Sequence, residues 1–345
     1  MNYQNLPAKV GFGAKAYSML PSLAQTLIIH GSSVEVDEFV EKIKKITSSN
    51  VSFFQFRDER RSIKKIENLS KKFKDVDCFI VIGGGSIIDS CKVLFKSLTN
   101  NSDKKKFFIP TLLGSGSESS MTAIINTRSK KNIFIDESFL PDGIIYDFKI
   151  LKLIRNDLLI LGHIDALIHC YESLTSINSN PFSEFLARNT IKNFLENFKE
   201  KKNKFFEIDN EFIKELSLLS FNGGICQSNA GAGLTHALAH STEELTKIPH
   251  SICISFFSKS ILNYLILNHK NLSFEKFEEI QKHVSFLWDH LEKKNLFSDI
   301  KNFLKNNQNF EKVLELSKKD PCWRLFKLKI DEEFLKKNIK KSYET

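Results

Sequence analysis

The chain has 345 residues, more than one hydrophobic core usually supports, so we expect two domains. Hydrophobic residues make up 41% and charged residues 26%, which are ordinary globular values and exclude a disordered chain. The formal net charge of +9 comes from short lysine runs mixed with Glu and Asp, as on solvated helix faces. Because no basic patch is interleaved with aromatic residues, we do not expect nucleic acid binding.

The cysteines and the N-terminal residues indicate the cellular compartment of the protein. The six cysteines form no CxxC pair and lie mostly in apolar runs, as buried thiols of a reducing compartment do. The N-terminus has no apolar signal core, and no stretch reaches the ~18 apolar residues of a membrane span. We therefore expect a soluble, cytoplasmic protein without a membrane partner.

The first half of the chain alternates predicted strands and helices. We expect strands at 9–12, 26–30, 51–56, 78–82, 107–109, 124–126, 132–135 and 143–146, and helices at 14–23, 36–46 and 62–73. Such alternation predicts an α/β domain with a doubly wound, Rossmann-like parallel sheet. Sheets of this kind bind ligands at the carboxyl ends of their strands.

Two loops rich in glycine and serine follow predicted strands. The segment GGGSIIDSCK at 83–92 allows a close backbone approach to an anion, and the next helix supplies free N–H groups. It is neither a GxGxxG fingerprint nor a Walker loop, and a glycine triplet is a simple tight turn about as often. The segment PTLLGSGSE at 110–118 follows the next strand. Two such loops at neighbouring strand ends would bracket a pyrophosphate and its sugar.

From about residue 149 the apolar residues recur at helical spacing. Helices are predicted at 181–194, 209–221, 252–267 and 274–291, with weaker ones after them, and Gly223-Gly224 is expected to interrupt the second. We place the domain boundary near Asp147. This predicts an α/β domain at 1–147 and an all-α domain at 148–345.

Residues 229–250 hold three of the nine histidines, namely His236, His240 and His250. His236 and His240 are four apart and share one helix face, and His250 follows a proline that starts a new segment. Asp165 and His169 repeat the four-residue spacing. Imidazole and carboxylate are the ligands of a borderline cation such as zinc or ferrous iron. We therefore predict a metal site, against the alternative of scattered polar residues on two helices.

Four segments, GGGSIIDSCK, PTLLGSGSE, HIDALIHC and SNAGAGLTHALAH…IPH, resemble in order and spacing the signatures of the iron-containing (group III) alcohol dehydrogenases, a family with a dehydroquinate-synthase-like fold. The resemblance covers nearly the whole chain. It implies a nucleotide-binding domain, an all-helical domain, and a divalent metal (Fe²⁺ or Zn²⁺) in the cleft between them. The metal ligands it implies are Asp165, His169, His236 and His250, with His240 beside the nicotinamide. The cofactor-site residues it implies are Gly84, Gly85, Ser86, Asp89, Thr111 and Lys131.

The chain departs from the family pattern at three places. Leu112 stands where the family has a second threonine, and His163 stands where it has a small residue, so His163 is expected to crowd or decorate the substrate pocket. Gly31 and Ser32 follow the second strand, where many members carry an aspartate that bonds the adenosine ribose. Without that carboxylate we expect Gly31 and Ser32 to contact the cofactor, and NADP to be used at least as well as NAD. The alternative is that Glu35 or Asp37, which follow closely, takes the place of the aspartate and restores a preference for NAD.

The resemblance implies a metal-dependent NAD(P) alcohol dehydrogenase or aldehyde reductase. Hydride would pass between a metal-bound alcohol and the nicotinamide, with His240 as the expected proton relay. The partner would be a small alcohol, an aldehyde or a sugar acid, and a homodimer is compatible with the family. Two alternatives stay open: an oxidase of sugar-acid hydroxyls resembling 3-deoxy-octulosonate 8-oxidase, and a dehydroquinate-synthase-like cyclase.

Overall fold

The computed structural model describes residues 6–22, 25–31, 41, 43–46, 50–57, 62–98, 103–127, 131–201, 208–268 and 277–344. Contacts divide the chain into two compact units. The first contains Met1–Arg155 and Glu207–Ser228, and the second contains Asn156–Phe206 and Asn229–Thr345. A boundary near Asp147 stays a prediction, because a later helical segment also groups with the first unit.

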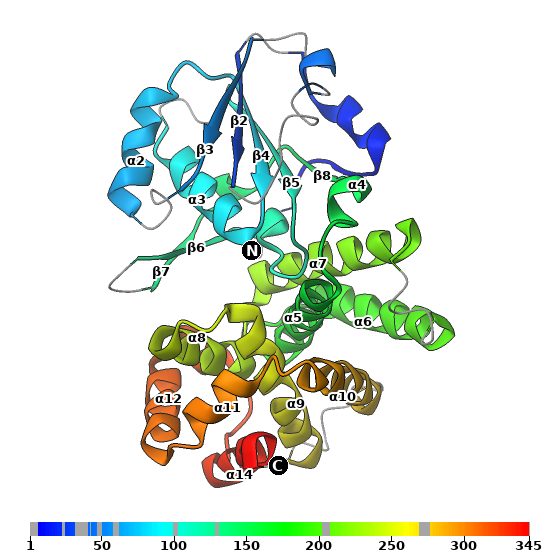
Figure 1. Cartoon of the computed structure of the whole chain (residues 1–345), viewed down its shortest axis with the longest axis vertical. Helices are drawn as coiled ribbons and strands as arrows, with labels where there is room; N and C mark the ends of the chain where they lie inside the picture. Colours follow the sequence, from blue (N-terminus) through cyan, green and yellow to red (C-terminus); the bar gives the residue numbers. More distant parts are fainter. Residues whose placement is uncertain are drawn as a thin grey trace. The chain divides into compact units, whose positions relative to one another are not determined.

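The first unit is built on a six-stranded parallel sheet with the order β1-β8-β5-β4-β2-β3 (Figure 1). The chain passes outward from β2 to β3 and then returns to β4 on the other side of β2. Strands β2 and β4 therefore flank the point where the strand order reverses, which is where such sheets bind ligands. The strands are β1 (Val10–Phe12), β2 (Gln25–His30), β3 (Asn50–Gln55), β4 (Cys78–Gly83), β5 (Lys105–Pro110) and β8 (Gly143–Tyr146). The predicted parallel sheet is confirmed.

Helical segments accompany these strands. They are η1 (Ala14–Met19), α2 (Ile63–Lys72), α3 (Gly85–Lys96), the short turns η4 (Ser117–Ser119) and η5 (Glu137–Phe139), α4 (Phe148–Leu151) and most of α7 (Asn210–Ala230). The predicted helix at 36–46 lies largely outside the described residues, although 43–46 is helical.

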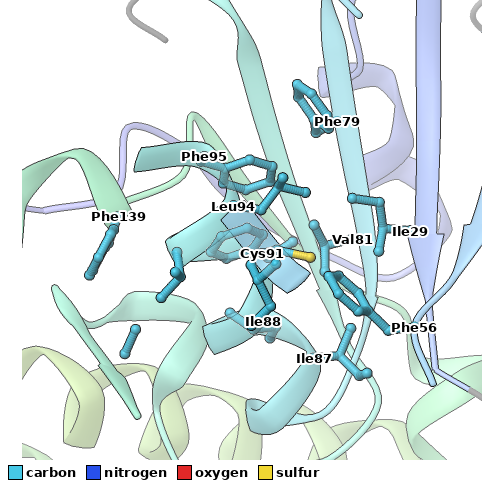
Figure 2. Close-up of a cluster of buried hydrophobic side chains, with 14 of the residues drawn as sticks. Ile29, Phe56, Phe79, Val81, Ile87, Ile88, Cys91, Leu94, Phe95 and Phe139 are labelled. Atoms are coloured by element: carbon cyan, nitrogen blue, oxygen red, sulfur yellow. The ribbon is translucent and has the colours of Figure 1, made fainter. Parts of the chain in front are cut away.

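Both faces of the sheet are buried at β4. Phe79 and Val81 of β4 pack on the α3 side, in the core that Figure 2 shows, whereas Ile80 and Ile82 belong to the core on the opposite face. Since alternate side chains meet apolar partners on both sides, the strand is a continuous apolar run. This explains why the sequence of β4, CFIVIG, does not alternate apolar and polar residues.

Two of the predicted strands form a separate hairpin. Strand β6 (Thr122–Asn126) pairs antiparallel with β7 (Lys131–Ile135), and β6 packs against α3. The strands were predicted correctly, but they do not join the parallel sheet.

Among its described residues the second unit is helical, as predicted. Its helices are α5 (Asn156–Leu174), α6 (Pro181–Lys201), α8 (Leu234–Thr246), α9 (His250–Asn268), α10 (Phe277–Lys293), α11 (Ser298–Leu304), α12 (Asn307–Lys319), α13 (Pro321–Leu325) and α14 (Glu332–Glu344). Helix α9 packs against α5, α8, α10 and α14. By length and composition α9 could cross a membrane, but 61% of its apolar window is buried, as in a core helix.

The predicted interruption at Gly223-Gly224 is wrong, because α7 runs continuously through both glycines. A Cβ on Gly224 would overlap the carbonyl oxygen of Gly116 and the hydroxyl of Ser119. The glycine therefore permits close contact between the loop after β5 and the α7 backbone. Gly116 itself has a φ of 60°, a conformation that favours glycine.

Candidate active site

Three loops meet at the carboxyl edge of the parallel sheet in the first unit. Gly31 follows β2, and a Cβ there would lie 3.2 Å from Cγ1 of Ile87 in the first turn of α3. A Cβ on Gly85, after β4, would lie 2.8 Å from Oγ of Ser115 in the loop after β5. The ends of β2, β4 and β5 are therefore in contact at the point where the strand order reverses.

The N-terminus of α3 is accessible at this edge. Gly84 and Gly85 are half-buried and Ser86 is exposed, and the N-cap residue Gly84 provides no side-chain capping bond. Thr111 is also half-buried, and its backbone N–H donates to the carbonyl of Gly83 at 3.0 Å. Open N–H groups at a helix N-terminus suit a phosphate.

Asp89 has bonding partners inside the unit. Its Oδ1 accepts a hydrogen bond from Oγ of Ser117 at 2.5 Å, and its Oδ2 accepts one from the backbone N–H of Ile124 at 2.9 Å. The ammonium group of Lys92 lies 3.7 Å from Oδ1. Asp89 thus fixes the second Gly/Ser loop to α3, and a direct bond from this carboxylate to a cofactor stays a prediction.

The positions of two other predicted cofactor residues do not test their roles. Lys131 is half-buried and begins β7 in the antiparallel hairpin. Ser32 lies outside the described residues. The structure therefore gathers Gly31, Gly84, Gly85, Ser86 and Thr111, and leaves the roles of Lys131 and Ser32 as predictions.

A buried group of potential metal ligands lies in the second unit. Asp165 and His169 on α5 and His236 on α8 have ligand atoms that all lie within 4.8 Å of one another. Oδ1 of Asp165 is 3.5 Å from Nε2 of His236 and 3.8 Å from Nε2 of His169. The two imidazole rings stack with centroids 4.5 Å apart. The predicted helical spacing places Asp165 and His169 on one face of α5, and the packing of α8 brings His236 to them.

These atoms fit a divalent cation. Oδ1 of Asp165 and Nε2 of His236 are buried atoms without a hydrogen-bond partner, a state that needs an explanation in a protein core. Burial alone would raise the pKa of Asp165, but His169 and the other imidazoles outweigh it and hold the pKa at about 2. Burial lowers the pKa of His169 to about 4. An ionised carboxylate and a neutral imidazole are the forms that bind metal. At His236 burial is outweighed by Glu172 and Asp165, which raise the pKa of its imidazole to about 9, so a metal ion bound there would displace a proton.

His250 lies beside this group rather than within it. It is the first residue of α9, and its ring centroid is 5.6 Å from that of His236 and 5.3 Å from that of His240. Its Nδ1 is 3.5 Å from Oε2 of Glu243. The structure therefore assembles three of the four predicted ligands closely and places the fourth next to them.

The sequence reasoning missed Glu172. This carboxylate is 2% exposed and accepts a bond from Nδ1–H of His236 at 2.6 Å. It also accepts bonds from the backbone N–H groups of Gly233 at 2.5 Å and Thr235 at 2.6 Å. A carboxylate on the second nitrogen of a metal-binding histidine fixes its ring and tautomer. The sequence could have indicated Glu172, because positions 165, 169 and 172 share one face of a helix.

The position of His240 is defined by two neighbours. Its ring meets that of His236 edge-on with centroids 5.9 Å apart, and its Nδ1 is 3.0 Å from Oδ2 of Asp320. Asp320 and Cys322 form a second close group of potential ligands with His240. The sequence did not indicate Asp320, which lies 80 positions away.

His163 is buried by neighbouring helices. Its Nε2 is 2.9 Å from Nε2 of His283 on α10, and its ring meets Phe194 of α6 edge-on with centroids 4.2 Å apart. Burial lowers the pKa of both imidazoles, that of His283 to about 3. One neutral ring therefore donates to the other. These contacts account for the imidazole of His163 within the helical unit, and its predicted role at a substrate pocket stays a prediction.

Comparison with known proteins identifies the family. Residues 7–148 match the iron-containing alcohol dehydrogenases, and residues 159–320 match the C-terminal region of the same family. The chain is 27% identical over 202 residues to 4-hydroxybutyrate dehydrogenase of Clostridium kluyveri, an alignment that covers 54% of this chain and 54% of that protein. It is 26% identical over 309 residues to NADPH-dependent butanol dehydrogenase of Clostridium saccharobutylicum, covering 81% of this chain and 77% of that protein. The chain thus spans only about half the length of the first of these relatives.

Solved structures show the same fold. An iron-containing alcohol dehydrogenase from Thermococcus thioreducens matches with a TM-score of 0.80 and 19% identity over 100% of both chains. Maleylacetate reductase from Rhizobium sp. strain MTP-10005 matches with a TM-score of 0.80 and 15% identity, covering 99% of this chain and 97% of that one. The two sequence matches together cover most of the chain, and they show that it belongs to the iron-containing alcohol dehydrogenase family.

Proposed function

We propose that the chain is a metal-dependent oxidoreductase that transfers a hydride between an alcohol carbon and a nicotinamide cofactor. The observation that carries the proposal is the buried group of Asp165, His169 and His236, in which the facing atoms Oδ1 of Asp165 and Nε2 of His236 lack hydrogen-bond partners. The relatives that are named as alcohol, butanol and hydroxybutyrate dehydrogenases support the reaction class.

The metal would be held by Asp165, His169 and His236, with His250 as the fourth ligand. When bound, a divalent ion supplies Lewis acidity, which lowers the pKa of an alcohol hydroxyl and polarises a carbonyl. Glu172 keeps the His236 ring in place from its far side. These ligand types suit both iron and zinc, so the residues alone do not select one.

The reaction is balanced by two transfers. In the oxidative direction the carbinol C–H bond breaks, and its electron pair passes with the hydrogen to the nicotinamide ring. The hydroxyl proton leaves as the carbonyl forms. His240 is the residue that we propose to carry this proton, because it lies one helical turn from His236 and an imidazole exchanges protons near neutral pH.

We further propose that NADP is used at least as well as NAD. An acidic residue at the end of the second strand normally accepts the ribose 2′-hydroxyl and repels a 2′-phosphate. Gly31 has no carboxylate at this position, and the related butanol dehydrogenase is named as NADPH-dependent.

The metal assignment is tested by elemental analysis of purified wild type and His236→Ala. We expect one divalent ion per chain in the wild type and its loss in the variant. A matched control is His283→Ala, which removes a buried histidine of the same unit from outside the group and should retain the ion. Unchanged metal content in His236→Ala would refute the ligand assignment.

The reaction class is tested by a screen of primary alcohols, aldehydes and sugar acids, with nicotinamide absorbance as the readout. A chelator-sensitive change in absorbance is expected with at least one primary alcohol or aldehyde. A response confined to sugar acids would support the sugar-acid oxidase instead. Product formation without net cofactor reduction would indicate a cyclase reaction that uses the cofactor only transiently.

We also propose a cytoplasmic location. All six cysteines are buried and form no disulfide, which suits a reducing compartment.

A further inference from the structure

Asp320 connects the end of α12 to the His240 ring. Its Oδ2 lies 3.0 Å from Nδ1 of His240, and its Oδ1 accepts a bond from the backbone N–H of Cys322 at 2.8 Å. The two side chains are only 13% and 7% exposed. The contact is therefore a charge-assisted hydrogen bond that is largely shielded from water.

This bond determines which imidazole nitrogen carries hydrogen. A carboxylate only accepts, so Nδ1 of His240 must donate, and the neutral ring then has its basic lone pair on Nε2. Burial acts to raise the pKa of Asp320, but the bonds from His240 and from the Cys322 N–H outweigh it and keep the pKa below its usual range. The rings of His236 and His250 pack against His240 and restrict its rotation further.

The helix start at Pro321 does not by itself require a carboxylate. Asparagine and serine cap helices about as well as aspartate, and capping uses Oδ1. Oδ2 makes the separate bond to His240. The charge at position 320 is therefore explained by the imidazole rather than by the backbone.

We propose that Asp320 is a positioning residue for His240. It holds the ring in the Nδ1–H tautomer and in one orientation, so that Nε2 is the nitrogen that exchanges the substrate proton. The inference rests on the proposed role of His240 as proton relay.

The test compares Asp320→Ser with wild type in the zinc-loaded protein, because serine retains the cap but removes the carboxylate. The control is Asn306→Ala, which removes the side-chain cap of α12 without touching His240. Long-range proton–nitrogen NMR reports the tautomer of each imidazole, and the His240 signals are those absent from His240→Gln. We expect Nδ1–H in the wild type and in Asn306→Ala, and a shift toward Nε2–H in Asp320→Ser.

Kinetics supply the second readout. We expect kcat to fall about 10–100-fold in Asp320→Ser, the usual scale for losing a partner that orients a functional histidine, with KM and zinc content nearly unchanged. Asp320→Glu should recover part of kcat. In a His240→Ala background the same serine substitution should have no further effect on kcat, because Asp320 acts through that ring.

The outcomes separate this inference from the proposed function. An unchanged His240 tautomer in Asp320→Ser overturns the positioning role, whatever the activity. If the tautomer shifts but neither Asp320→Ser nor His240→Ala alters kcat, the proton relay fails, and the catalytic purpose of the positioning fails with it. A second zinc ion per chain that Asp320→Ser removes would also overturn the inference, since Asp320 would then be a ligand in the group with Cys322.

Discussion

Replacing Glu172 by glutamine should weaken metal binding without removing any ligand. In the wild type, Oε2 of Glu172 accepts bonds from the ring of His236 and from the Gly233 N–H, while Oε1 accepts from the Thr235 N–H. Glutamine has the same shape but only one acceptor oxygen. In one orientation its NH₂ group faces the Thr235 N–H, and in the other it faces both the His236 ring and the Gly233 N–H.

Either orientation leaves at least one buried N–H facing another donor, which costs about 1–3 kcal/mol of folding stability. Loss of an orienting partner typically lowers metal affinity by about 10–100-fold. That range corresponds to about 1.4–2.7 kcal/mol of binding free energy. Glu172 is almost fully buried, so solvent should not screen this effect strongly.

Competition with a chelator measures the zinc affinity, and denaturant unfolding of the metal-free protein measures stability separately. Glu243→Gln is the matched control, because Oε2 of Glu243 lies 3.5 Å from Nδ1 of His250, too far for a strong hydrogen bond. We expect Glu243→Gln to lose much less zinc affinity than Glu172→Gln. A folded Glu172→Gln protein that binds zinc as tightly as wild type would refute the reasoning.

Three further changes have defined outcomes. His240→Ala should lower kcat by about 10²–10⁴-fold while metal content and cofactor affinity are retained, and loss of metal would show that His240 is a ligand. Gly31→Asp should lower kcat/KM for NADP relative to NAD by an amount equivalent to about 1–3 kcal/mol. Gly31→Asn is the control, because it adds a Cβ beside Ile87 without a charge. A wild type that prefers NAD by more than about tenfold would contradict the proposed role of this loop. Lys96 and Asp136 form an ion pair at 2.8 Å. The bond from Lys96 lowers the pKa of Asp136 to about 2, although burial acts to raise it. Lys96→Met should remove this ion pair. A carboxylate whose pKa is lower in the folded chain than in the unfolded chain stabilises the fold at pH values above its unfolded pKa, here near 3.8. This stabilisation is lost as the pH falls toward 2. Denaturant unfolding should therefore show Lys96→Met less stable at pH 7 by at most about 1 kcal/mol after solvent screening, with the difference shrinking below pH 4; a constant difference would contradict this account.

Local patterns were enough to predict most of the fold. The apolar run at 78–82 and the glycines after it predict a buried strand followed by a helix, and the structure has β4 and α3 there. The spacing of His236 and His240, and of Asp165 and His169, predicts one helix face for each pair, and α8 and α5 confirm it. These predictions succeed because helix and strand periodicity depend on neighbours within a few residues.

Other features depend on contacts between distant segments. The sequence favoured a helix break at Gly224, but the glycine is needed because Gly116, more than a hundred positions earlier, packs against it. The bond between Asp320 and His240 spans 80 positions and has no local pattern. Glu172 lies on the predicted helix face, yet only the start of α8 shows what it bonds. Amino-acid order thus determined the elements and the ligand types, whereas the tertiary structure decided which carboxylate orients which imidazole, because hydrogen bonds join groups that only folding brings within about 3 Å.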